Sequence, residues 1–210
     1  MKKILLSVAL ISASLFTFAQ SAKLGIRGGL NLASLSASSK SFDASGSTGN
    51  LVAFNAGFFA DLKVGKLSVQ PGIYYSGKGG KEADGLNSST TVKLHYIEVP
   101  VTLVYHAPVI IGDIYLGAGP YAAMGFAASG RVLSEGTDTK EDLKFGDGPD
   151  NVKRADYGVQ FIGGLQLKKG IAIHFNYDLG LTNILPEAAT GGGDFKIKNG
   201  VFGIGLGYSF

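Results

Sequence analysis

The chain has 210 residues, of which 45% are apolar and only 17% are charged, and it contains 32 glycines but no cysteine or tryptophan. This composition excludes an intrinsically disordered chain, and the lack of cysteine excludes disulfide scaffolds, thiolate metal sites and cysteine nucleophiles. The formal net charge of +3 includes Lys2 and Lys3, and without them the chain is nearly neutral. The basic pI therefore does not indicate a nucleic-acid partner, and we expect none.

Residues 1–19 have the organisation of a secretory signal peptide. Two lysines precede an apolar stretch that is interrupted only by small hydroxyl residues. Thr17 and Ala19 suit the small-residue positions that signal peptidase requires, so we expect cleavage after Ala19. The alternative is an uncleaved membrane anchor, for which the stretch is short. The sequence thus predicts a signal peptide, 1–19, followed by one exported domain, 20–210.

In the exported domain, apolar residues recur at every second position, which is the spacing of a β-strand with one apolar face. The first segment shows it clearly, because Leu24, Ile26, Leu30 and Leu32 alternate with glycine and polar residues. The pattern predicts eight strands of about ten residues, the length at which a tilted strand crosses a bilayer. In chain order the predicted strands are 23–32, 52–64, 67–76, 95–105, 114–124, 156–167, 171–181 and 202–210.

The connections between these strands alternate in length. The short ones are Gly65-Lys66, a segment around 106–113, and Lys168-Lys169-Gly170. The long ones are 33–50, 77–91, 127–153 and 183–197. Short turns at one rim and long loops at the other are typical of outer-membrane barrels. We therefore expect an all-β, eight-stranded antiparallel up-and-down transmembrane β-barrel in the outer membrane of a Gram-negative bacterium. Both termini would be periplasmic and four long loops extracellular.

Alternation alone also fits a soluble barrel of the lipocalin type, with the apolar face inside. A polar face in water is expected to be rich in lysine and glutamate. Here that face is mostly glycine, tyrosine, glutamine, asparagine and serine, while Phe54, Phe58, Phe161, Phe175 and Phe202 share the apolar face. These features favour lipid outside the barrel and a crowded lumen inside it.

The same parity directs a set of charged residues into the lumen. Because an isolated charge is costly in such an interior, we expect these residues to form an ion-pair network, in which Arg27 and Glu98 compensate each other. The predicted network consists of Arg27, Asp61, Lys63, Glu98, Asp156 and Asp178. A proton relay or a catalytic carboxylate pair is the alternative use of these groups. An eight-stranded barrel has room only for side chains, so we expect a plugged lumen and no wide pore.

The enzymatic alternative is a lipid-A-modifying barrel, which needs a histidine and a serine close together at the level of the outer leaflet. His95 is predicted to face lipid, with Ser88 and Ser89 in the preceding loop, and their spacing indicates no catalytic dyad. The acidic stretch 135–150 does not match a calcium-binding loop. We therefore expect a non-enzymatic protein with no catalytic residues, no cofactor and no metal site.

Several short motifs recur along the exported domain. The most specific is the run His95–Val101, with a tyrosine, a glutamate and a proline separated by aliphatic residues. The others are the glycine-containing segments Gly25–Leu32, Gly117–Tyr121, Asp156–Gly158 and Gly205–Phe210. Together they resemble the PorT-like outer-membrane β-barrel family of Bacteroidetes, whose architecture is related to OmpX and to the OmpA membrane domain. The resemblance covers nearly the whole exported domain, and it implies an outer-membrane barrel without assigning a particular activity.

The C-terminal residues Tyr208 and Phe210 look like the signal by which the barrel-assembly machinery recognises its clients, or else like ordinary aromatic residues at the membrane interface. The expected function is that of a structural or surface-interaction protein. Its expected partners are outer-membrane lipids, lipopolysaccharide, the barrel-assembly machinery and an envelope protein complex. The alternative is an accessory component of an envelope secretion or uptake machine.

Overall fold

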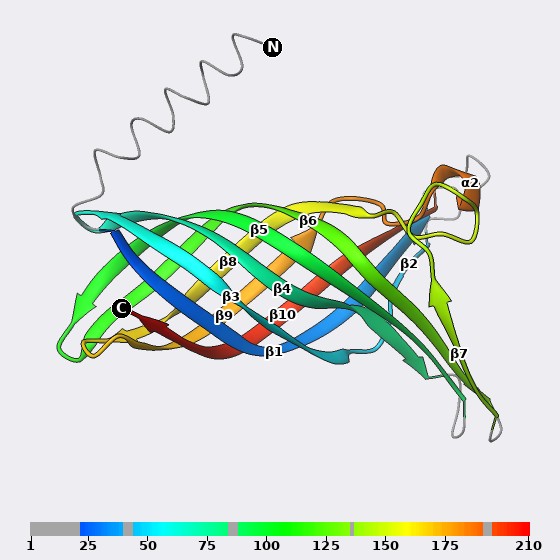
Figure 1. Cartoon of the computed structure of the whole chain (residues 1–210), viewed down its shortest axis with the longest axis horizontal. Coiled ribbons are helices and arrows are strands. Elements are labelled where there is room, and N and C mark those ends of the chain that lie inside the picture. Colours follow the sequence, from blue (N-terminus) through cyan, green and yellow to red (C-terminus); the bar gives the residue numbers. More distant parts are fainter. Residues whose placement is uncertain (1–21, 40–43, 84–87, 135–136, 191–194) are drawn as a thin grey trace, which may run out of the picture.

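The computed structural model describes residues 22–39, 44–83, 88–134, 137–190 and 195–210 (Figure 1). The predicted signal peptide lies outside the described residues. The strands are β1 (Ala22–Ser39), β2 (Ala44–Ser47), β3 (Leu51–Val64), β4 (Leu67–Ala83), β5 (Ser89–Val109), β6 (Gly112–Ser134), β7 (Thr137–Leu143), β8 (Ala155–Leu167), β9 (Ile171–Gly180) and β10 (Phe195–Ser209). A short helix, α2 (Glu187–Thr190), precedes β10. In the part of the chain that the structure describes, no helix is long and apolar enough to cross a membrane.

The strands form a closed barrel. The sheet runs in the order β10-β9-β8-β6-β5-β4-β3-β1, and an antiparallel pairing of β10 with β1 joins its two ends. This seam extends from Gly25 opposite Ser209 to Ser39 opposite Phe195. The two further strands, β2 and β7, lie outside the ring and pair with β1 and β6. The prediction of an eight-stranded up-and-down antiparallel barrel is confirmed for the ring.

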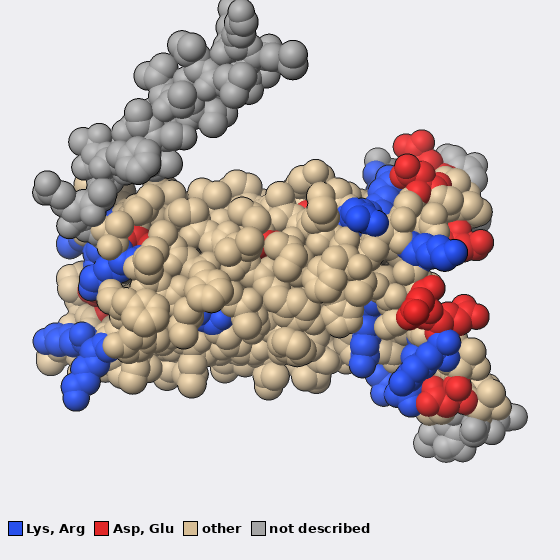
Figure 2. All heavy atoms as spheres, viewed as in Figure 1, with Lys and Arg blue, Asp and Glu red and all other residues tan. Residues whose placement is uncertain are grey.

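The outer face of the barrel is apolar, as the alternation predicts. Along β9 every second residue, from Ile171 to Leu179, is exposed, while the residues between them are buried. The most exposed large side chains of the strands include Phe58 and Leu116, each with 67% of its surface accessible. Figure 2 shows Lys, Arg, Asp and Glu gathered at the two ends of the barrel, with a largely uncharged band between them. Such a band is the surface that a bilayer requires of a barrel.

The two ends of the barrel differ. At one end, called the turn end here, lie the turns at 65–66, 110–111 and 168–170 and the C-terminus (Figure 1). Gly65 and Gly170 have φ values of 62° and 88°, a conformation that glycine adopts readily and other residues rarely. The opposite end, called the loop end, carries β2, β7 and α2 (Figure 1).

The strands continue far into the segments predicted as long loops. At the loop end β1 extends to Ser39, β4 to Ala83 and β6 to Ser134, so parts of 33–50, 77–91 and 127–153 are strand. β10 already begins at Phe195, within the predicted loop 183–197. These extensions were missed because beyond the hydrocarbon the outward positions no longer need to be apolar, and the alternation disappears.

The C-terminal residue completes the seam between β10 and β1. The backbone N–H of Phe210 donates to the carbonyl of Leu24 at 2.8 Å, and the Phe210 ring meets that of Tyr208 edge-on with 5.2 Å between centroids. Ser209 donates to the carbonyl of Gly170 at 2.9 Å, which ties the seam to the neighbouring turn.

Deleting Phe210 should therefore reduce the yield of folded barrel several-fold, because the carbonyl of Leu24 loses its donor where strand closure is needed. Removing residues 137–142 of β7 is the control, since β7 pairs only with β6 outside the ring and length changes in water cost little. Folded barrel is measured as the fraction that migrates differently on a gel with and without boiling. Equal yields from the two deletions would contradict the role given to the seam.

Candidate functional site

The lumen carries a cluster of buried charged residues from four strands. Lys78 of β4, Glu98 of β5, Asp156 of β8 and Asp178 of β9 all point inward, and each is at most 2% exposed. The Nζ atom of Lys78 lies 2.7 Å from Oε2 of Glu98 and 3.1 Å from Oδ2 of Asp156. We call these four residues the central cluster. One lysine thus forms ion pairs with two carboxylates that come from different strands of the barrel.

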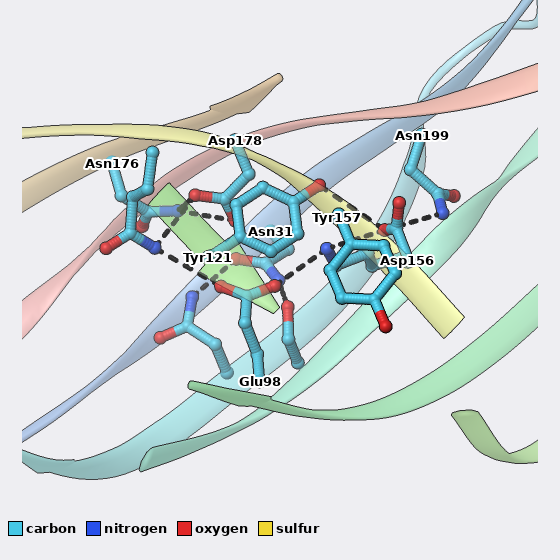
Figure 3. Close-up of polar contacts among 12 residues, drawn as sticks. Asn31, Glu98, Tyr121, Asp156, Tyr157, Asn176, Asp178 and Asn199 are labelled. Atoms are coloured by element: carbon cyan, nitrogen blue, oxygen red, sulfur yellow. Dashed lines mark hydrogen bonds and ion pairs between the residues drawn. The ribbon is translucent and has the colours of Figure 1, made fainter. Parts of the chain in front are cut away.

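Neutral polar side chains donate further hydrogen bonds to these carboxylates. The amide of Gln160 donates to Oε1 of Glu98 at 3.2 Å and to Oδ1 of Asp178 at 2.9 Å, so it joins these two acids. Asn199 donates to Asp156 at 3.0 Å, and the hydroxyl of Tyr121 donates to the same carboxylate at 3.3 Å. Figure 3 shows Glu98 and Asp178 with Asn176 on one side of the cluster and Asp156 with Asn199 on the other. Such hydrogen bonds are what makes buried charges tolerable.

Glycine shapes the strand that carries Lys78. Gly79 has a φ of 128°, and a Cβ atom there would lie 2.0 Å from the carbonyl oxygen of Val92 on β5. Only glycine permits this close approach of the two backbones. The ammonium group of Lys78 lies near two aromatic rings, with Nζ 4.2 Å from the ring centroid of Tyr121 and 5.4 Å from that of Tyr96. An ammonium over a desolvated tyrosine ring gains cation–π stabilisation in addition to its ion pairs.

Toward the turn end, the lumen contains a second polar group of residues. Arg27 donates to Oε1 of Gln70 at 2.8 Å, and its guanidinium carbon lies 3.8 Å from the ring centroid of Phe59. Phe59 breaks the alternation of β3, and the structure places it inside the barrel, where it supports Arg27. Nearby, the hydroxyl of Tyr115 lies 3.0 Å from Nδ1 of His174.

The loop end of the lumen is closed by apolar side chains. They come from the four ring strands β1, β5, β6 and β10, from β7, and from the segments that follow β7 and β9. The buried members are Leu35, Leu94, Tyr96, Tyr121, Ala123, Ala128, Val152 and Ile184, with Val92, Leu143, Phe145 and Ile197 packed against them. We call this set the apolar cap. Phe145 fits over Gly125, where a Cβ atom would lie 2.4 Å from its ring, so this glycine makes room for the cap.

Between the central cluster and Arg27 the structure leaves one small polar cavity of about 20 Å³. Arg27, Tyr74, Glu98, Gln160 and His174 are among the residues that line it. A cavity of this size holds about one water molecule. Three groups of side chains thus follow one another along the lumen from the loop end to the turn end, namely the apolar cap, the central cluster and the group around Arg27.

The residues predicted to form one network lie in three separate places. Glu98, Asp156 and Asp178 belong to the central cluster. Arg27 lies nearer the turn end and donates a hydrogen bond to Gln70. The predicted pairing of Arg27 with Glu98 is therefore wrong, because the ion-pair partner of Glu98 is Lys78. Asp61 and Lys63 lie near the turn end.

At that end, Lys63 pairs with Asp113 across 3.3 Å, and both side chains are about one third exposed, with 33% and 32% accessible. Asp61 approaches His106 with 3.9 Å between Oδ1 and Nε2.

Lys78, the residue that organises the cluster, was missed by the sequence reasoning. It lies in the run Gly77–Lys81, which is part of the predicted loop 77–91 and contains no apolar side chain. The available signal is the parity of β4, since Ser68, Gln70 and Ser76 are buried and Lys78 continues that series. If the inward parity of β4 is continued beyond Tyr75, Lys78 falls on the lumen face of the strand.

One serine and one histidine do meet inside the barrel. Ser68 Oγ lies 2.9 Å from Nε2 of His106, but both residues are only 2% exposed, and Asp61 approaches the same ring nitrogen. A hydrolytic triad needs the acid on the opposite nitrogen and an accessible serine. His95 lies on the outer face, where Nδ1 is 2.6 Å from the hydroxyl of Tyr75. Within the described residues, no group of three His, Cys, Asp or Glu side chains could hold a metal ion.

The family to which the sequence belongs agrees with the architecture. The sequence model of the outer membrane protein beta-barrel domain matches residues 18–185. Among solved structures, the chain is similar to Ail, the attachment invasion locus protein of Yersinia pestis, at 14% identity and a TM-score of 0.44, covering 90% of this chain and 97% of that chain.

It is also similar to neisserial surface protein A, NspA, at 15% identity and a TM-score of 0.46, covering 90% and 99%. OprG from Pseudomonas aeruginosa is similar at 14% identity and a TM-score of 0.42, covering 90% and 96%. A search of curated proteins finds no match.

The central cluster makes a quantitative prediction. Replacing Lys78 by methionine keeps the length of the side chain but leaves Glu98 and Asp156 without their shared cation, so the free energy of unfolding should fall by about 3–5 kcal/mol. The triple change Lys78→Met, Glu98→Gln, Asp156→Asn should recover most of this loss, because both carboxylates that pair with Lys78 are then neutral, while Asp178 keeps its hydrogen bonds from Gln160 and Asn176. Urea unfolding in lipid vesicles, followed by tyrosine fluorescence, measures both.

The matched control is Lys63→Met, which breaks the ion pair with Asp113 at the turn end, where both side chains are about one third exposed. Ion pairs in contact with water contribute little, so the expected loss is about 0–1 kcal/mol. If Lys78→Met were as stable as Lys63→Met, the central cluster would be solvated and its assigned role would be wrong.

Proposed function

We propose, since this chain belongs to the outer membrane protein beta-barrel domain family, that it is a non-enzymatic membrane barrel with a plugged lumen and an interaction surface at its loop end. The observation that carries this proposal is the filling of the barrel interior. Ion-paired charges that are at most 2% exposed occupy its centre, and the apolar cap covers them. Neither level leaves space for a solute, and neither presents an accessible nucleophile.

The loop end offers a polar surface beyond the apolar band. Lys81, Arg131 and Lys140 occupy one register row across β4, β6 and β7, joined through Thr91 of β5. Arg131 binds Asp138 through two hydrogen bonds of 2.7 and 2.6 Å, which hold the pKa of the Asp138 carboxyl below its usual range. The other two cations of this row, Lys81 and Lys140, can bind anionic groups of the outer leaflet or of a partner protein. Its chemistry supports lipopolysaccharide and envelope proteins as the partners that we propose.

The proposal includes a topology for the chain. The segment 1–19 is a signal peptide, 20–210 is the mature domain, and the turn end with both termini faces the periplasm. Tyr208 and Phe210 act as the signal for the barrel-assembly machinery, which their place at the closing seam supports. The sequence motifs described above support a place among PorT-like barrels of Bacteroidetes.

A deletion strain separates this proposal from its alternatives. With a surface-interaction barrel, the mass spectrum of lipid A and the composition of the large envelope complexes should match those of the wild type. An altered lipid A would identify an enzyme. Loss of a secretion or uptake complex would identify an accessory component of that machine.

The plugged lumen predicts that the purified protein conducts no solutes. Liposomes that contain the folded barrel should not swell in isotonic arabinose, because the interior cavity has room for about one water molecule. A general porin reconstituted at the same protein-to-lipid ratio is the positive control. Swelling at a rate near that of the porin would overturn the plugged-lumen proposal.

The topology predicts which lysines an external protease can reach. Trypsin added to intact cells should cleave after Lys140 or Lys144 at the loop end, both of which are exposed. Lys66 and Lys168, exposed at the turn end, should be cleaved only after the outer membrane is opened. Mass spectrometry of the released peptides measures this, and cleavage at Lys66 or Lys168 in intact cells would reverse the proposed orientation.

A further inference from the structure

The outer face of the barrel is not uniform, because it contains a large apolar groove. The groove lies over β6, β8, β9 and β10 and has a volume of about 1090 Å³. Bulky side chains form its walls, among them Ile114, Leu116, Phe161, Phe175 and Phe202. At the turn end it is bounded by Ile110 and Ile111, the exposed tip of the β5–β6 hairpin.

The strand register explains the floor of the groove. Gly163 of β8 lies directly between Leu116 of β6 and Phe175 of β9. On β8 itself, the residues two positions before and after Gly163 are large, namely Phe161 and Leu165. A Cβ atom on Gly163 would point at Cδ2 of Leu116, 2.8 Å away, so the glycine leaves a low point between the large outward side chains around it.

The turn end of the groove adjoins two unpaired lysines. The backbone N–H of Lys168 donates to the carbonyl of Ile111 at 3.2 Å, which fixes the β8–β9 turn against the hairpin tip. Val109 lines both the groove and a neighbouring rim cavity that includes Lys168 and Lys169. In the described part of the chain, no carboxylate forms an ion pair with either lysine, and Asp113 of the same rim is engaged by Lys63.

We propose that this groove is a binding site for an anionic phospholipid of the leaflet at the turn end. The acyl chains lie along the apolar groove over Gly163, and the phosphate group is held by Lys168 and Lys169. Basic side chains at the membrane surface attract anionic headgroups, and apolar grooves accept acyl chains. The inference rests on the proposed membrane insertion and adds a specific lipid to it.

A second copy of this chain is the other occupant to consider, and the charges disfavour it. Two barrels in one membrane have the same orientation, so a symmetric contact through this face would bring their lysine pairs together at one level. Like charges placed opposite each other destabilise an interface. A lipid phosphate instead complements the lysines at the height where headgroups lie.

The test uses the full folded protein in nanodiscs that contain equal amounts of phosphatidylglycerol and phosphatidylcholine. Native mass spectrometry after release should show phosphatidylglycerol bound in preference to phosphatidylcholine. The double change Lys168→Gln, Lys169→Gln should weaken this preference by about tenfold or more, since each basic residue near a surface contributes to anionic lipid binding. Gly163→Leu should reduce the retention of both lipids by filling the floor.

Matched controls use the same changes elsewhere on the barrel. Lys66→Gln alters another lysine at a turn-end hairpin, and Ala56→Leu enlarges an exposed small residue of β3 outside the groove. Both should leave lipid retention unchanged. Soluble glycerol phosphate should not displace the lipid at equal concentration; displacement would place the site on the lysines alone and contradict the role of the groove.

Gel mobility with and without boiling separates the possible failures. If the wild type shows no folded form in lipid, the proposed membrane insertion fails. If all variants fold but phosphatidylglycerol is not preferred, or if Lys66→Gln weakens it as much as the double change does, only the lipid-site proposal fails. Because the lysine changes touch no packed side chain, they remain informative even if Gly163→Leu prevents folding.

Discussion

In a hydrocarbon layer no water is available to bind backbone N–H and C=O groups, so each must find a partner within the protein. The seam between β10 and β1 meets this requirement by turning an open sheet into a ring. Closure then divides every strand into two faces with opposite demands. The outer face must be apolar over the height of the membrane, and the inner face must fill a narrow space from which water is largely excluded.

The inner face explains why the charges of this protein are arranged as they are. A carboxylate in the lumen cannot be solvated, and an eight-stranded ring is too narrow to admit a column of water beside packed side chains. Lys78 therefore forms ion pairs with both Glu98 and Asp156, and Gln160 links Glu98 to Asp178 by hydrogen bonds. Where the barrel meets water at the turn end, Lys63 and Asp113 form a simple pair that is about one third exposed.

Much of the fold could be predicted because the side-chain period of a strand is two and lipid enforces it. Parity alone placed Glu98, Asp156 and Asp178 inside, and the structure agrees. Parity does not give height along the barrel, because strand tilt and register decide which inward residues share a level. For this reason Arg27 was expected beside Glu98, although it lies nearer Gln70 and Phe59.

The same limit explains the errors at the loop end. Beyond the membrane the outer face is free to be polar, so the extensions of β4 and β6 carry no apolar alternation and resemble loops. Lys78 lies in such a stretch, between Gly77, which lies against Ala53 of β3, and Gly79, which admits the close approach of β5. The groove over Gly163 also required three-dimensional information, since a single glycine becomes a gap only when Leu116 and Phe175 are known to flank it.

The central cluster also bears on how quickly the protein reaches its native state. The contact between Lys78 and Asp156 joins residues that are 78 positions apart in the chain. Contacts between distant residues require long loops to close first, and proteins that depend on them fold slowly. Strands β4 and β8 are not neighbours in the sheet, so this ion pair forms only after the intervening strands are aligned. We therefore expect the burial of these charges to be a late step of folding, after β5 and β6 have aligned between β4 and β8.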